Sequence, residues 1–163
     1  MKIFIGADHA GFELKEKLKV YLKELGYEVE EKGAFQYNEN DDYPDFVKLV
    51  AEAVAEGPES ERRRGIILGG SGQGEAMCAN RNPGVRAAVF YGQVLPQNVI
   101  DIKGRKSADP FEIIKLAREH NDANILCIGA RFISEDETKF AVELFLSTKF
   151  SGEERHIKRI AKF

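Results

Sequence analysis

The chain alternates between short apolar runs and longer stretches in which apolar residues recur every three or four positions. Short runs rich in β-branched residues predict buried strands, and the longer period predicts amphipathic helices. Strands are expected at Lys2–Ala7, Tyr27–Lys32, Gly65–Leu68, Val85–Phe90 and Asn124–Gly129. Helices are expected at Phe12–Leu25, at Pro44–Ala55, in a short stretch that begins after the glycines at 69–74, at Phe111–His120 and at Glu135–Leu146.

Five strands that alternate with helices predict an α/β fold, a three-layer sandwich around a five-stranded, parallel, doubly wound (Rossmann-like) sheet. At 163 residues the chain is expected to form a single domain, residues 1–163. The segments that follow parallel strands gather at one edge of such a sheet. Asp8, His9, the glycine-rich loop, His120 and Arg131 are therefore expected to converge there. Taken singly, Asp8 also suits a helix cap and His9 an ordinary loop position.

Four segments depart from this alternation of strands and helices. Gly57-Pro58 is expected to end the second helix, and Arg62-Arg63-Arg64 is interpreted as exposed loop charge. The acidic run Asp41-Asp42-Tyr43-Pro44-Asp45 is interpreted as solvated. Residues 92–110 are expected to form an insertion, which is either an embellishment with a role or a flexible excursion.

The loop Gly69-Gly70-Ser71-Gly72-Gln73-Gly74-Glu75 links an expected strand to an expected helix. Glycine permits tight turns and lets backbone N–H groups approach a bound group, and a helix N-terminus adds further donors and partial positive charge. The loop therefore predicts a site for a phosphate or an enolate-like oxyanion.

Neither standard nucleotide-binding motif fits this loop. In a dinucleotide fingerprint that starts at Gly70, the third glycine would fall at Glu75, and no acidic residue closes the strand Val85–Phe90. In a phosphate loop from Gly69 to Gly74, Glu75 replaces the lysine that neutralises phosphate. We therefore expect no nucleotide bound in either form.

Glu75 itself has two interpretations. A carboxylate in the first turn of a helix interacts favourably with the helix dipole by a fraction of a kcal/mol, and local context alone slightly favours this structural role. The same charge would repel a phosphate bound directly against the loop. That conflict makes Glu75 a candidate for a chemical role.

Composition and charge limit the partners and the cellular location that the sequence predicts. The formal net charge of −3 gives no reason to expect nucleic acid or an acidic membrane surface as partner. No signal-peptide pattern and no apolar run of membrane-spanning length is present, so a soluble, cytoplasmic protein is expected. Cys78 and Cys127 lack the clustered spacing of a zinc site and are interpreted as core thiols.

The three histidines, His9, His120 and His156, all fall in expected loops or terminal segments beside polar residues. Histidine exchanges protons near neutral pH. If the basic C-terminal tail is helical, Arg155 and Arg159 lie one turn apart and form a fork for phosphate; the alternative is favourable charge at a helix end. Together these residues predict an anionic substrate and proton transfer.

On these residues the sequence strongly resembles the ribose-5-phosphate isomerase B family, which includes isomerases of galactose 6-phosphate and allose 6-phosphate. The motifs that carry the resemblance are Gly6-Ala7-Asp8-His9-Ala10-Gly11-Phe12, Asp42-Tyr43-Pro44-Asp45, Gly69 to Gly74, Ala79-Asn80-Arg81, Gly84-Val85-Arg86-Ala87, Arg118 to Asn124, Gly129-Ala130-Arg131 and Gly152 to Arg159.

The resemblance implies a metal-independent, cofactor-free homodimer or tetramer in which two subunits build each active site. Many members carry a catalytic cysteine at the position of Gly69, which neither cysteine of this chain occupies. The loop resembles instead a branch that uses a glutamate six residues later, here Glu75. Burial that raises the pKa of a carboxylate towards working pH suits it to remove a proton α to a carbonyl.

The remaining roles also follow from the resemblance. Glu75 would move the proton between C2 and C1 while Ser71 and the amides around Gly70, Gly72 and Gly74 hold the enediolate. His120 would assist ring opening. The residues implied to bind the sugar or its phosphate are Asp8, His9, Tyr43, Asn121, Arg131, Arg155, Arg159 and, more weakly, His156, with the arginines of the tail reaching in from the partner.

The expected activity is interconversion of ribose 5-phosphate and ribulose 5-phosphate in carbohydrate metabolism. Two alternatives stay open: an isomerase of six-carbon sugar phosphates, and a sugar-phosphate-binding protein without catalysis. The insertion at 92–110, where typical members have far fewer residues, leaves the preferred sugar length undecided.

Overall fold

The computed structural model describes residues 1–56 and 63–163. In chain order the elements are β1 (Lys2–Ala7), α1 (Phe12–Glu24), β2 (Glu28–Glu31), α2 (Tyr43–Ala55), β3 (Arg63–Gly69), α3 (Gln73–Ala79), β4 (Ala87–Phe90), α4 (Glu112–Asn121), β5 (Ile125–Gly129), α5 (Glu135–Ser147) and α6 (Glu154–Ile160).

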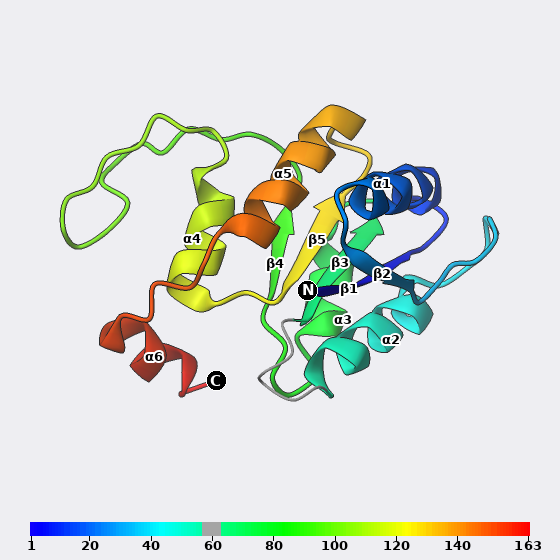
Figure 1. Cartoon of the computed structure of the whole chain (residues 1–163), viewed down its shortest axis with the longest axis horizontal. Coiled ribbons are helices and arrows are strands. Elements are labelled where there is room, and N and C mark those ends of the chain that lie inside the picture. Colours follow the sequence, from blue (N-terminus) through cyan, green and yellow to red (C-terminus); the bar gives the residue numbers. More distant parts are fainter. Residues whose placement is uncertain (57–62) are drawn as a thin grey trace.

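All strand pairings in the sheet are parallel, and the strand order is β2-β1-β3-β5-β4. Helices cover both faces, so the expected three-layer, doubly wound architecture is confirmed (Figure 1). One face packs against α1, α4 and α5, and the other packs against α2 and α3. The connections that follow β1 and β3 leave the sheet toward opposite faces, to α1 and to α3, and ligands of doubly wound sheets bind at such a point.

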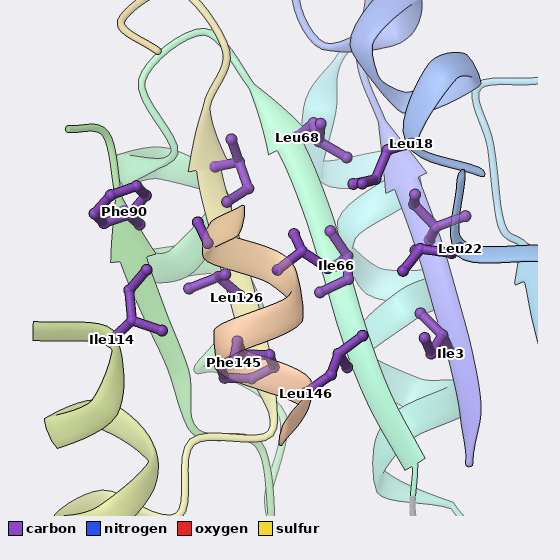
Figure 2. Close-up of a cluster of buried hydrophobic side chains, with 14 of the residues drawn as sticks. Ile3, Leu18, Leu22, Ile66, Leu68, Phe90, Ile114, Leu126, Phe145 and Leu146 are labelled. Atoms are coloured by element: carbon purple, nitrogen blue, oxygen red, sulfur yellow. The ribbon is translucent and has the colours of Figure 1, made fainter. Parts of the chain in front are cut away.

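The period-two alternation of the strands divides the core between these faces. Ile66 and Leu68 of β3 pack towards α1 and α5, whereas Ile67 between them packs towards α2. Figure 2 shows the first group, with Leu18 and Phe145 reaching the same side of the sheet from the helices. Each fully buried side chain of this size contributes about 1.5–3 kcal/mol, so the sheet is a rigid base for the loops at its edge.

The third strand starts earlier than its apolar run indicated. Arg63 and Arg64 belong to β3 and are half-buried, so their interpretation as exposed loop charge was wrong. The Arg63 guanidinium donates to the carbonyl of Ala53 at 3.0 Å and lies over the ring of Phe4. Arginine can place its apolar stem on a sheet and keep its charged end hydrogen-bonded. The expected helix stop at Gly57-Pro58, and Arg62, lie outside the described residues.

Residues 92–110 contain neither helix nor strand but fold back on the body of the protein. The amide of Val94 donates to the carbonyl of Pro110 at 3.0 Å, which brings the two ends of the segment together. Arg105 pairs with Glu119 of α4 at 2.6 Å, and Lys103 pairs with Glu153 before α6 at 2.7 Å. These contacts dock the segment on the elements that carry His120 and the basic tail.

Across the part of the chain that the structure describes, no helix combines the length and apolar character needed to cross a bilayer.

Candidate active site

Three loops meet at the carboxyl edge of the sheet, where β1, β3 and β5 end. Asp8 and His9 directly follow β1, and the glycine loop follows β3. The amide of Ala130, after β5, donates to the carbonyl of Gly69 at 2.8 Å, and that of Arg131 donates to Gly70 at 3.3 Å. The expected convergence of these loops at one edge is therefore observed.

Gly72 and Gly74 suit the tight turn of the glycine loop, because a side chain at either position would be strained or crowded. Gly72, the residue before α3, has φ of 77°, and a Cβ there would lie 3.1 Å from the carbonyl oxygen of Cys127. A Cβ on Gly74 would lie 2.7 Å from the hydroxyl of Tyr43. The Ser71 hydroxyl accepts a hydrogen bond from the amide of Gln73 at 3.3 Å. The loop thus exposes backbone groups to a ligand, with the hydroxyls of Ser71 and Tyr43 beside them.

Gly69 has a separate role, because the Glu75 carboxylate takes the space beside it. A Cβ built on Gly69 would overlap Oε1 of Glu75. The carboxylate therefore lies where a longer side chain at position 69 would begin. Glu75 can take this position only if residue 69 is glycine.

The Glu75 side chain is nearly enclosed, with 4% of the residue exposed. Burial raises the pKa of the Glu75 carboxyl, and the negative charge of Asp8 raises it further. Hydrogen bonds with the backbone of Glu75 and Gly72 oppose this shift. A buried carboxylate with a raised pKa beside donors of a loop has the properties of a general base.

The raised pKa of Glu75 predicts how the stability of the fold changes with pH. A carboxyl whose folded pKa exceeds its unfolded pKa stabilises the fold in its neutral form, and this contribution is lost as the pH rises through the folded pKa. Glu75→Gln, which is neutral at every pH, should have the Tm of wild type near pH 4 and a higher Tm at pH 8. Thermal melts across this range check it. A Tm difference that is equal at both pH values would contradict the burial of an ionised Glu75.

Beside Glu75, the two loops after β1 and β5 bring together positive charge. The Arg131 guanidinium lies over Gly70, with Nη1 at 3.4 Å from a Cβ built there. The hydrogen bond to Asp41 raises the pKa of His9, and the positive charge of Arg131 opposes part of this rise. Two cationic or proton-donating groups next to backbone amides suit an anionic ligand.

The side chain of Asp41 is a part of this site that sequence reasoning missed. Its Oδ1 accepts hydrogen bonds from the backbone N–H of His9 at 2.9 Å and from Nδ1 of His9 at 2.8 Å. Only 6% of the Asp41 side chain is exposed, so the interpretation of the whole acidic run as solvated was wrong. The run resembled ordinary surface charge, and no signal in it separated Asp41 from Asp42.

A second group of predicted site residues lies elsewhere. His120 and Asn121 end α4, and the rings of His120 and His156 stack at 4.2 Å between centroids. Burial, followed by the charges of His120 and Arg155, lowers the pKa of His156. The tail is helical, as α6, so Arg155 and Arg159 lie one turn apart as expected.

This second group lies at the amino edge of the sheet. Arg86, which directly precedes β4, donates from Nε to the carbonyls of Asn121 at 3.1 Å and of Asp122 at 3.0 Å. Figure 1 shows α6 and the end of α4 at the end of the sheet from which the strand arrows point away. The expectation that His120 converges with the glycine loop within one chain was therefore wrong. His120 lies in the last turn of α4, which runs back to the start of β5. The length of β5, about 13 Å at ~3.3 Å per residue, then separates His120 from the glycine loop.

Asp8, His9 and Asp41 each place one potential metal-ligand atom within 4.8 Å of the others. Three of their atoms already have protein partners: Asp8 Oδ1 accepts from the amides of Ala10 and Gly11 at 3.0 and 3.2 Å, and Asp41 Oδ1 pairs with Nδ1 of His9. We assign no metal to this cluster. Cys127 is buried and Cys78 half-buried, and burial raises the pKa of the Cys127 thiol, as expected of a core residue.

A doubly wound parallel sheet, with a buried carboxylate beside a glycine loop at its carboxyl edge, defines an α/β protein built for an anionic ligand and proton transfer. The family follows from comparison with known proteins. The chain belongs to the Ribose/Galactose Isomerase family, whose sequence model matches residues 3–97 and 108–163. The unmatched residues 98–107 lie inside the expected insertion.

Individual relatives agree with this family. The chain is 37% identical over 160 residues to the ribose-5-phosphate isomerase B of Mycolicibacterium paratuberculosis, a match that covers 98% of this chain and 87% of the relative. It superposes with a TM-score of 0.82 and 35% identity on the ribose-5-phosphate isomerase B of Mycoplasma genitalium with bound ribulose-5-phosphate, covering 99% and 92% of the two chains. The corresponding enzyme of Clostridium thermocellum gives a TM-score of 0.81 at 40% identity, with 99% and 94% covered.

Proposed function

We propose that this protein is an aldose–ketose isomerase that interconverts ribose 5-phosphate and ribulose 5-phosphate through an enediolate, without a cofactor. The observation that carries the proposal is the buried Glu75 carboxylate with a raised pKa, which lies against Gly69 at the edge where the loops after β1, β3 and β5 meet. The relatives named ribose-5-phosphate isomerase B, one of them with ribulose-5-phosphate bound, support the same reaction.

The chemistry requires a base on one face of the open-chain sugar. Glu75 takes the proton from C2 of the aldose, and the electrons of the broken C–H bond form the C1–C2 double bond while the C1 oxygen becomes the enediolate oxyanion. The hydroxyl of Ser71 and the amides of residues 70–74 stabilise that oxyanion. Return of the proton to C1, with transfer of the O2 proton to O1, forms the ketose with its carbonyl at C2 and restores the Glu75 carboxylate.

The residues at the amino edge enter through a second copy of the chain. In one chain they lie about 13 Å or more from the glycine loop, a span too long for one side chain to bridge. We propose a homodimer or tetramer in which His120 of the partner opens the sugar ring and Asn121 of the partner binds its hydroxyls. Arg155 and Arg159 of the partner hold the phosphate together with His9, and Asp8, Tyr43 and Arg131 contact the sugar.

This arrangement separates the two negative charges of the reaction. The phosphate binds among His9 and the arginines, and the glycine loop serves the oxyanion at the other end of the sugar. Glu75 therefore does not face the phosphate directly. We further propose that residues 1–163 act as one domain and that the protein works in the cytoplasm, because a charged sugar phosphate does not cross a bilayer unaided.

One observation favours a second candidate function. Residues 98–107 fall outside the family match and are docked beside α4, which carries His120. The length of the sugar pocket in the assembled enzyme can therefore differ from that of the relatives. The candidate is isomerisation of a six-carbon sugar phosphate by the same proton transfer.

A side-by-side assay of ribose 5-phosphate, allose 6-phosphate and galactose 6-phosphate tests both candidates. We expect kcat/KM for ribose 5-phosphate to exceed the others by at least tenfold, since a pocket that excludes one extra carbon discriminates by about 10–200-fold. A preference for either six-carbon substrate would assign the second function. Binding of all three without turnover at any pH would show a binding protein that lacks catalysis.

A further inference from the structure

We propose that Asp41 is a positioning residue, which holds the His9 imidazole with Nδ1 against its carboxylate and leaves Nε2 to donate to the substrate phosphate. The inference deepens the proposed function and rests on it for the identity of the substrate. It assigns a role in phosphate recognition to a residue that never touches the phosphate.

The geometry of the pair is specific. One oxygen of Asp41 accepts both from the backbone N–H of His9 and from its Nδ1, at 2.9 and 2.8 Å, across 32 residues of sequence. These two bonds fix the position of the backbone and the rotation of the ring together. Residues 35–40, which precede Asp41, are all exposed, yet the Asp41 side chain is 6% exposed. The carboxylate therefore points inward from an otherwise solvated loop.

The chemistry of the pair determines which ring nitrogen faces the ligand. An ionised carboxylate only accepts hydrogen bonds, so Nδ1 carries a proton in this pair. Nε2 lies on the opposite side of the ring, away from Asp41. In neutral His9 this nitrogen is an acceptor, which a phosphate oxygen repels; in the imidazolium it is a charged donor. Whether His9 binds phosphate thus depends on its second proton.

The surroundings of His9 favour that proton. The hydrogen bond to Asp41 raises the pKa of His9, and the charge of Asp8 adds to this, while partial burial and Arg131 oppose it. Asp41 Oδ2 is buried and has no hydrogen-bond partner among the described residues. A buried carboxylate whose second oxygen is unpaired favours a positive charge on the one ring that it contacts.

Asp41→Asn tests the idea, because it keeps the size of the side chain and removes its charge. Asp42→Asn is the matched control: Asp42 is the exposed neighbour, and its side chain makes no capping hydrogen bond to α2. The chain has three histidines, so imidazole NMR resolves each titration, with His9→Asn identifying the His9 signal. We expect Asp41→Asn to lower the pKa of His9 and Asp42→Asn to leave it unchanged.

Binding and turnover supply the second readout. For Asp41→Asn we expect KM for ribose 5-phosphate and the Kd of inorganic phosphate to rise about tenfold, because neutral His9 loses the charge-assisted hydrogen bond from Nε2 to phosphate, with kcat within threefold of wild type. The increase should be greatest at pH values between the His9 pKa of the two proteins and vanish at lower pH, where both are charged. Asp41→Glu, which keeps the charge, should recover part of the affinity.

An unchanged pKa of His9 in Asp41→Asn would overturn the inference, and so would an increase in phosphate Kd that is the same at every pH. Equal effects of Asp41→Asn and Asp42→Asn would also overturn it. The NMR titration and the binding of inorganic phosphate need no turnover. They therefore decide the role of Asp41 even if the sugar assays were to refute the proposed isomerase.

Discussion

Glu75→Gln is expected to lower kcat for ribose 5-phosphate by about 10²–10⁴-fold and to change KM little. Glutamine keeps the shape that fills the space beside Gly69 but has no lone pair basic enough to accept the C2 proton. The enclosed position of Glu75, 4% exposed, leaves no room for bulk water to replace it as the base. Steady-state kinetics at the pH optimum measure both parameters.

The matched control is Glu13→Gln. Glu13 also lies in the first turn of a helix, α1, but unlike the buried Glu75 it is exposed. The substitution Glu13→Gln removes the same kind of favourable interaction with a helix dipole. It therefore separates a catalytic role of Glu75 from the role of a charge that stabilises the start of a helix. Glu75→Gln with kcat near wild type, or an equal loss in both variants, would show that Glu75 is a helix-start charge and no base.

Mixing two inactive variants is expected to restore activity. Glu75 lies at the carboxyl edge and His120 at the amino edge, so in a shared site the two residues come from different subunits. When Glu75→Gln and His120→Asn chains are unfolded together and refolded as a mixture, half of the dimers are hybrids. Each hybrid contains one site with both natural residues, and activity should return to roughly a quarter of wild type under random pairing.

The control mixture combines Glu75→Gln with Asp8→Asn. Asp8 and Glu75 lie at the same edge of one chain, close enough for the charge of Asp8 to raise the pKa of Glu75. No hybrid then contains a site with both natural residues, so activity should equal the average of the two separate variants. No restoration with His120→Asn, or equal restoration in both mixtures, would refute a site divided between subunits in this way.

The elements of the fold were predictable because their signals are local. The alternation of Ile66, Ile67 and Leu68 between two faces and the period of three to four in α1 and α5 each arise from the geometry of one element. Strand order and layers then follow from rules of handedness and burial. The early start of β3 was missed, because Arg63 and Arg64 are charged residues that nevertheless occupy half-buried strand positions, which their apolar stems permit.

The candidate site was only partly predictable. Asp8, His9, the glycine loop and Arg131 follow strands, and topology alone brings such residues to one edge. His120 was misplaced, because the rule for residues after strands was applied to a residue after a helix. Asp41 was dismissed, because a carboxylate that turns inward to a histidine 32 residues away has the same sequence pattern as one in solvent.

The sequence by itself determined the α/β class, the glycine loop, the helical spacing of Arg155 and Arg159 and the resemblance that singled out Glu75. These depend on residues near one another in the chain. Only the tertiary structure decided that the Glu75 carboxylate lies in the space beside Gly69, that Asp41 holds His9 and that His120 lies at the far edge. Those outcomes depend on how distant segments pack, and burial, which raises the pKa of Glu75, exists only once they have done so.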